Sequence, residues 1–341
     1  MTIVLVSDGM LEREACRHLA NAFQQRGRPC LTVGPAADAE LRLDPQLLPG
    51  HPALEQASAI GLFLQDPADI RSFLSNYRAL CHHLGRQPVA VFSGPLVPLV
   101  GDALIADLSQ RLGCDLLMVS GDQQLKQLEA LSFNWPESLA RPTAIATGFW
   151  FPSNAPNQPV AQPMLLALIQ ETIPTHIGAH EQLLRQLNRW AWDQPHWTVM
   201  LQRDHPWSAD RPLFPDDQPI APNLHSATPG QLLPLLSSCT ACLTVSSPWI
   251  LAAMQWGRIP VIVGDYGIHE EQQTTRFFGS GVMHRLRSIR NLDQLLQLPR
   301  VNQHWLAETG GCISDGATRL LQALARLPAG RTPSTAPYSC C

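Results

Sequence analysis

The stretch TVSSPWILAAMQWGRIPVIVGDYG, residues 244–267, decides the fold that the sequence predicts. An apolar strand, expected over 241–245, stops at two adjacent serines, and a helix is expected to follow directly over 248–256. A second apolar strand is expected over 259–264. Strand, helix and strand in such close succession are typical of a right-handed crossover between parallel neighbours. The stretch therefore predicts an α/β unit built on a parallel sheet.

The same alternation runs through the rest of the chain. In the first half, strands are expected over 2–6, 30–33, 59–64, 88–92, 115–119 and 143–147, and helices over 11–25, 69–84 and 102–112. In the second half, further strands are expected over 164–169 and 197–202, and helices over 179–192, 231–236, 292–298 and 317–327. Between the halves, 151–163 is rich in Pro, Asn and Ser, which is the composition of a linker.

A chain of 341 residues is long enough for two domains, each with its own core. We therefore expect an α/β fold of two Rossmann-like domains with a cleft between them. The N-terminal domain is expected over 1–150, the linker over 151–163, the C-terminal domain over 164–328 and a loose tail over 329–341. Ligands of such sheets bind outside the carboxyl ends of the strands, so the functional residues are expected at those ends.

Composition excludes several classes of function. The formal charge is -4, with no basic run or stripe, which argues against a nucleic-acid partner. No window approaches about 18 uninterrupted apolar residues, so we expect no transmembrane helix. The N-terminus lacks the features of a signal peptide, and we expect a cytoplasmic protein.

Metal sites are not expected either. Cys239 and Cys242 form a CxxC pair, but no second pair completes a zinc site, and we expect both to be free and buried in the core. Asp216 and Asp217 lie in a Pro-rich segment that favours a solvated turn over a metal-binding motif.

The serines of the opening stretch have two interpretations. Pro248 suits the first position of a helix, which makes Ser247 the natural N-cap. A helix N-terminus also carries free N–H groups and a partial positive charge, so Ser246 and Ser247 are candidates to bind a phosphate.

Further candidates follow the neighbouring strands. Arg203 and His205 come at the end of the expected strand 197–202, where both are candidates to hold a phosphate, although a surface turn is the alternative for His205. Gly264 allows a ligand to approach the backbone, and Asp265 is a candidate contact for a ribose or an acceptor, with a solvated loop as the alternative.

In the N-terminal half, Asp8 follows the first expected strand in the motif VSDGM. Either it caps the next helix or it serves as a general base.

These motifs resemble those of a known enzyme class. CLTVSSPWILAAMQWGRIPVIVGDYG, 242–267, is similar to the nucleotide-sugar half of two-domain glycosyltransferases of the GT-B type. The pairs His205-Pro206 and Ser246-Ser247 are similar to the donor-binding motifs of bacterial sialyltransferases and polysialyltransferases, which hold the phosphate and cytidine of a CMP-sugar. Through DLLMVSG, LIQETIP and FFGSG, the chain also resembles an uncharacterised bacterial family described as glycosyltransferases. VSDGM departs from the acidic motif of the sialyltransferases, because Ser7 replaces its first acid.

The resemblance implies a glycosyltransferase that uses a nucleotide-sugar donor, with a CMP-linked acidic sugar favoured, and a glycan or other hydroxyl acceptor. The donor is expected on the C-terminal domain, while Asp8 takes the proton of the acceptor and the anomeric centre inverts, without a metal or cofactor. A UDP-sugar 2-epimerase-like enzyme is the first alternative. The second is a degenerate protein that binds a nucleotide-sugar without turnover, and the imperfect motif at Asp8 keeps it open.

Overall fold

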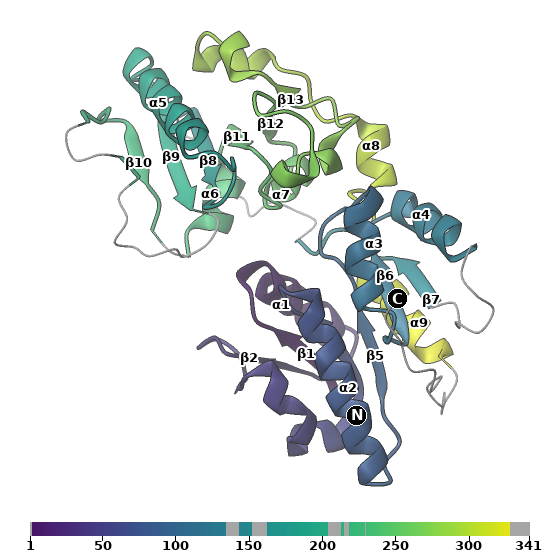
Figure 1. Cartoon of the computed structure of the whole chain (residues 1–341). Helices are drawn as coiled ribbons and strands as arrows, with labels where there is room; N and C mark the ends of the chain where they lie inside the picture. The colour runs from purple at the N-terminus through teal and green to yellow at the C-terminus, as the bar shows by residue number, and fades with distance from the viewer. Residues whose placement is uncertain are drawn as a thin grey trace. The chain divides into compact units, whose positions relative to one another are not determined.

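The structure is a computed structural model that describes residues 2–133, 143–151, 162–203, 213–214, 218–228 and 230–327. The chain forms two compact units (Figure 1). Unit 1 comprises Met1–Phe151 and Glu308–Cys341, and unit 2 comprises Pro152–Ala307. Each unit has its own parallel sheet, so the prediction of two Rossmann-like α/β domains is confirmed.

Unit 1 contains a seven-stranded sheet in the order β3-β2-β1-β4-β5-β6-β7, and its paired strands are all parallel. Its strands are β1 (Thr2–Ser7), β2 (Cys30–Gly34), β3 (Leu41–Arg42), β4 (Ala57–Phe63), β5 (Ala90–Ser93), β6 (Leu116–Val119) and β7 (Thr143–Ala146). Its helices are α1 (Met10–Gln24), α2 (Pro67–His83), α3 (Gly101–Gln110), α4 (Asp122–Phe133) and α9 (Gly316–Arg326).

The helices of unit 1 cover both faces of the sheet. Buried side chains of α2, α3 and α4, such as Phe73, Leu104 and Leu128, form one core cluster with the strands. The cluster on the other face joins α1 and α9 to the sheet. The strand order reverses between β1 and β4, because β2 lies on one side of β1 and β4 on the other. In open α/β sheets this switch point is where ligands bind, outside the carboxyl ends of the strands.

The position of α9 differs from the sequence analysis, which placed residues up to 328 in the C-terminal domain. Ala317, Leu320 and Ala323 of α9 are buried in the same cluster as Leu5 and Phe92 of unit 1. The apolar stripe of an amphipathic helix must be covered, and the sheet of unit 1 supplies that cover. The linker prediction falls mainly on residues 152–161, which lie outside the described residues.

Unit 2 contains a six-stranded sheet in the order β10-β9-β8-β11-β12-β13, again with parallel pairing. Its strands are β8 (Met164–Ile169), β9 (Thr198–Arg203), β10 (Leu224–Ser226), β11 (Ala241–Thr244), β12 (Ile259–Val263) and β13 (Met283–His284). The helices α5 (Ile177–Asp193), α6 (Leu232–Ser238) and α7 (Ile250–Gln255) belong to this unit, and α8 (Gln303–Glu308) lies at its boundary. The switch point of this sheet lies between β8 and β11.

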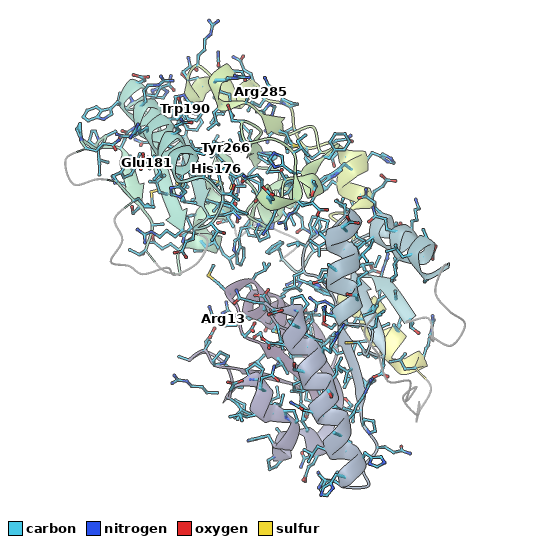
Figure 2. The ribbon with its side chains drawn as sticks, viewed as in Figure 1. Arg13, His176, Glu181, Trp190, Tyr266 and Arg285 are labelled. Carbon is cyan, nitrogen blue, oxygen red and sulfur yellow. The ribbon has the colours of Figure 1, made fainter. Side chains whose placement is uncertain are left out.

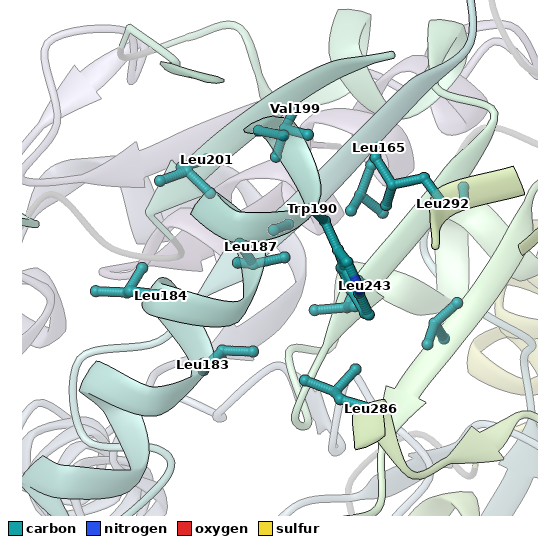
Figure 3. Packing of buried hydrophobic residues seen from close by; sticks show 14 of the residues in the cluster. Leu165, Leu183, Leu184, Leu187, Trp190, Val199, Leu201, Leu243, Leu286 and Leu292 are labelled. Atoms are coloured by element: carbon teal, nitrogen blue, oxygen red, sulfur yellow. The ribbon is translucent and has the colours of Figure 1, made fainter. Parts of the chain in front are cut away.

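The core of unit 2 forms around α5. Trp190 has no solvent exposure and packs in one cluster with Leu187, Leu243, Leu286 and Leu292 (Figure 3). Cys239 and Cys242 are fully buried in the core, which confirms the prediction of a core-facing pair. Across the described ranges, no helix has both the length and the apolar character that crossing a membrane would require.

Candidate functional site

The side chain of Gln170 joins two loops at the switch point of unit 2. Ser246 follows β11, and Gln170 follows β8 directly. The main-chain N–H and the hydroxyl of Ser246 both donate to Oε1 of Gln170, at 3.0 and 3.2 Å. The predicted serine corner therefore lies at the position where sheets of this kind bind ligands, but Gln170 accepts its hydrogen bonds in this structure.

Ser247 supports the local chain. Ser246 and Ser247 have no solvent exposure. The N–H of Ser247 donates to Oγ1 of Thr244 at 3.0 Å, and Oγ of Ser247 accepts from the N–H of Trp249 at 3.4 Å. α7 begins at Ile250, two residues later than the sequence predicts. The prediction that Ser247 is the N-cap is wrong, because the N-cap of α7 is Trp249, without a side-chain cap hydrogen bond, while the phosphate-binding role of both serines stays a prediction.

The predicted basic residue Arg203 lies one strand, β8, away from the serine corner. Arg203 is the last residue of β9, partly buried and in register with Ile169 of β8. Its neighbour Gln202 is buried, and Oε1 of Gln202 has no hydrogen-bond partner among the described residues. His205 lies outside the described residues, as do Asp216 and Asp217. Arg203 is thus next to the switch point, and the structure leaves its phosphate role a prediction.

Gly264 and Asp265 organise the edge of the sheet. Gly264 donates its N–H to the carbonyl oxygen of His284 at 2.8 Å. Oδ2 of Asp265 accepts from the N–H of Leu286 at 2.5 Å. Asp265 is exposed, so its carboxylate combines this contact with access to solvent. The pair joins the loop after β12 to the segment after β13, and a ligand role is not tested by these contacts.

The loop after β12 contacts the loop after β8 and the first turn of α5 through residues that the sequence analysis did not identify. The hydroxyl of Tyr266, labelled in Figure 2, donates to the carbonyl of Ala179 at 2.9 Å. Nε2 of Gln272 donates to Oγ1 of Thr175 at 2.8 Å. β11 lies between β8 and β12 in the sheet, so these contacts connect the loops on either side of the serine corner.

Two buried polar atoms on this edge lack partners among the described residues: Oε1 of Gln272 and Nε2 of His284. Burial lowers the pKa of His284, which keeps its ring neutral near pH 7. Buried polar groups are nearly always hydrogen-bonded, so unpaired atoms at a ligand-binding edge mark candidate contacts. The sequence analysis singled out neither residue as a candidate.

In unit 1, Asp8 lies at the corresponding position. It follows β1, and its Oδ1 accepts from the N–H of Gln65, two residues after β4, at 2.8 Å. The N-cap of α1 is Gly9, without a side-chain cap hydrogen bond, so Asp8 does not cap that helix. Burial raises the pKa of Asp8, although the bond from Gln65 opposes the rise. The predicted general base therefore lies at the switch point of unit 1.

Glu12 is a second acid at this point, and the sequence analysis did not identify it. It lies in the first turn of α1 and packs over Gly9, where an added Cβ would be 2.1 Å from Oε2 of Glu12. That oxygen is shut off from solvent and has no hydrogen-bond partner among the described residues. Burial raises the pKa of Glu12 from 4.5 to about 7, and the charge of Asp8 adds to the effect. A carboxyl group of this kind changes its charge in the range in which general bases work.

A groove of about 220 Å³ lies beside α1. Its lining includes the polar side chains of Ser7, Arg13, Arg17, Asn21 and Thr32. Arg13, labelled in Figure 2, and Arg17 both pair with Asp38, at 3.5 and 2.9 Å.

In the described part of the chain, no group of three or more His, Cys, Asp or Glu residues is placed to hold a metal ion.

Comparison with solved structures shows the fold. The chain is similar to a UDP-N-acetylglucosamine 2-epimerase of Neisseria meningitidis bound to UDP-GlcNAc, with 10% identity, a TM-score of 0.62 and coverage of 95% of this chain and 100% of that one. A protein of Listeria monocytogenes described as a putative UDP-N-acetylglucosamine 2-epimerase gives 9% identity, a TM-score of 0.62 and coverage of 95% of both chains. The calicheamicin glycosyltransferase CalG4 gives 16% identity, a TM-score of 0.50 and coverage of 96% of this chain and 98% of that one. The two-domain GT-B arrangement of parallel sheets is therefore shared with transferases and epimerases.

Comparison with curated proteins finds no match. A family model matches residues 69–325, from α2 to α9, and so includes Ser246 and Asp265 but neither Asp8 nor Glu12. Because the match extends over most of the sequence, the chain belongs to the family described as "Putative glycosyltransferase (DUF6716)".

Proposed function

We propose that the protein is an inverting, metal-independent glycosyltransferase that uses a CMP-linked acidic sugar. The observation that carries the proposal is the location of the Ser246–Gln170 contact at the switch point of the unit 2 sheet, in a chain of a glycosyltransferase family. The preference for CMP rests on the resemblance of the His205-Pro206 and Ser246-Ser247 pairs to sialyltransferase motifs. The acceptor is a glycan or another molecule with a free hydroxyl, and the enzyme works in the cytoplasm.

In this proposal unit 2 binds the donor. Arg203 and His205 supply positive charge and hydrogen bonds to the phosphate, which gains negative charge as the sugar leaves. Ser246 and Ser247 contribute hydroxyl groups, and Gln170 must release Ser246 when the phosphate arrives. Gly264 and Asp265 contact the ribose from the next loop.

Unit 1 binds the acceptor. A carboxylate at the carboxyl end of β1, where Asp8 lies, accepts the proton of the acceptor hydroxyl. The oxygen attacks the anomeric carbon from the face opposite the phosphate, the bond from that carbon to the phosphate oxygen breaks, and the configuration inverts.

Ligand binding tests the donor site. We expect CMP or its sugar to raise the melting temperature of the protein more than UDP, GDP or their sugars, because a ligand of the folded state stabilises it by mass action. Ser246→Ala should lower the affinity for this ligand at least several-fold, as measured by calorimetry. The matched control is Ser237→Ala, since Ser237 is equally buried in unit 2 but lies at the end of α6, before β11. Unchanged affinity in Ser246→Ala and in a His205→Ala, Ser247→Ala double variant would contradict the placement of the donor.

Turnover separates the proposal from its alternative. A transferase releases free nucleotide in proportion to an added acceptor. Conversion of a UDP-HexNAc to its 2-epimer without any acceptor would instead identify an epimerase, whose fold this chain also shares.

A further inference from the structure

We propose that Glu12, rather than Asp8, is the catalytic residue that accepts the proton of the acceptor hydroxyl, and that Asp8 is a positioning residue beside it. The inference rests on the proposed glycosyltransferase function and names the base of that reaction. Both residues lie in unit 1.

Glu12 lies close to the carboxyl end of β1. α1 begins three residues after β1 ends, so its first turn lies at the carboxyl end of that strand. The strand order reverses between β1 and β4, and the bond from Gln65 to Asp8 joins the two strand ends there. Glu12 packs against the same loop, because an added Cβ on Gly9 would meet both Oε2 of Glu12 and Cγ of Gln65, at 2.1 and 2.5 Å. The residue is thus part of the switch point at which sheets of this type bind ligands.

The carboxyl groups of Asp8 and Glu12 differ in their hydrogen bonds. Oδ1 of Asp8 already accepts a main-chain hydrogen bond at 2.8 Å, which stabilises the ionised form and weakens that oxygen as a base. The Glu12 carboxyl group also interacts with its own main-chain N–H, but its Oε2 is buried and unpaired among the described residues. Leaving a buried carboxylate oxygen without a partner costs free energy, and a substrate hydroxyl that donates to it would remove that cost.

Charged groups near Glu12 shift its pKa in both directions. The charge of Asp8 opposes ionisation of Glu12, and Asp69 of α2 in turn opposes ionisation of Asp8. The guanidinium of Arg111, after α3, favours ionisation of Glu12, but it is held by Asp107 at 2.7 and 2.9 Å. Cys16, on the same helix, interacts with Glu12 but stays a neutral thiol because burial raises its pKa. Burial dominates the balance, and a pKa of about 7 for Glu12 suits a base at neutral pH.

The reaction is balanced without another reagent. The acceptor O–H gives its proton to the Glu12 carboxylate as the oxygen forms a bond to the anomeric carbon. The electron pair of the broken sugar–phosphate bond leaves with the nucleotide. The protonated Glu12 then returns its proton to solvent.

The test is the pH dependence of acceptor-dependent nucleotide release. For wild type, kcat/KM should rise with pH and level off above an apparent pKa of about 7. Glu12→Gln keeps the size of the side chain and should lower kcat about 10²–10⁴-fold, while the thermal shift with the donor nucleotide stays unchanged. Glu14→Gln, the same change two residues further along α1, should keep the rate and the profile. Asp8→Asn should remain active with a lower apparent pKa, because the charge that opposes ionisation of Glu12 is gone. A purely structural role would not move that value.

The outcomes separate the two proposals. If Glu12→Gln retains the rate and pH profile of wild type, or if Asp8→Asn alone abolishes turnover, the assignment of the base to Glu12 is wrong and the proposed function stands. If wild type neither binds a nucleotide-sugar nor releases nucleotide with any acceptor, the proposed function fails and the role of Glu12 fails with it. Far-UV circular dichroism of each variant confirms that a lost rate is not lost folding.

Discussion

The carboxylate of Asp8 accepts a hydrogen bond from the main-chain N–H of Gln65, 57 residues later in the chain. Ser246 and Gln170, 76 residues apart, make the corresponding contact in unit 2. In each unit the contact joins the two strands between which the strand order reverses. In each sheet a polar side chain thus connects the loops that follow the two strands at the switch point.

The contact at Asp8 has a measurable effect on stability. Asp8→Ala removes the acceptor of the Gln65 N–H, and hydrogen bonds to charged groups contribute about 1.5–3 kcal/mol to the free energy of unfolding. Asp8→Asn retains a side-chain oxygen and should lose less than half as much. Urea denaturation followed by circular dichroism measures both. Equal stability of the alanine variant and wild type would show that the contact contributes nothing.

The free energy of unfolding should fall as pH rises, because Glu12 ionises. Folding raises its pKa from 4.5 to about 7, so the folded state binds the proton more tightly than the unfolded chain. The resulting stabilisation is complete below pH 4.5 and is lost as pH rises through about 7, by at most about 3 kcal/mol. Glu12→Gln cannot ionise, so urea denaturation between pH 5 and 8 should give it a smaller loss than wild type. If the free energy of unfolding changes equally with pH in the two proteins, folding does not raise the pKa of Glu12.

Two substitutions of Trp190 distinguish how much its aromatic ring and its N–H each contribute to the free energy of unfolding. Nε1 is buried without a hydrogen-bond partner among the described residues. Trp190→Ala should lower the free energy of unfolding by about 3–5 kcal/mol, as for other large core residues. Trp190→Phe keeps an aromatic ring and removes the unpaired donor, so its stability should lie within about 1 kcal/mol of wild type. Urea denaturation compares the three proteins, and a phenylalanine variant as unstable as the alanine variant would show that the N–H is bonded.

Two glycines should respond in opposite ways to the same substitution. A Cβ on Gly94, after β5, would lie 1.9 Å from the carbonyl oxygen of Met118, so Gly94→Ala should cost about 1–3 kcal/mol. A Cβ on Gly178, in the first turn of α5, would meet no atom within 4 Å. Gly178→Ala should therefore leave stability unchanged or raise it by up to about 1 kcal/mol. Thermal unfolding of both variants provides the measurement, and a similar change in melting temperature would contradict the packing at Gly94.

Apolar periodicity predicted several long elements, since β8 matches its expected range and α1 begins one residue before its expected start, but it missed the 12-residue helix α4. The strands β3, β10 and β13 were not predicted, because two or three residues are too few to show an alternating pattern. The side chains of Asp8 and Ser246 were placed at strand ends from the sequence.

The partners of those side chains could not be found the same way. The bond from Gln65 to Asp8 depends on which strands become neighbours, and so does the contact between Gln170 and Ser246. Glu12 reads in sequence as an ordinary acid in the first turn of a helix. Its raised pKa arises from burial, which local sequence does not encode.

The return of α9 to unit 1 has a consequence for biosynthesis. Unit 1 needs residues from both sides of unit 2 to complete its core, so a nascent chain exposes the α9-binding face until α9 itself has left the ribosome. Unit 2 is contiguous and is able to fold earlier, although it comes second in the sequence. A chain stopped after residue 307 would carry a complete second unit attached to a first unit with bare apolar side chains.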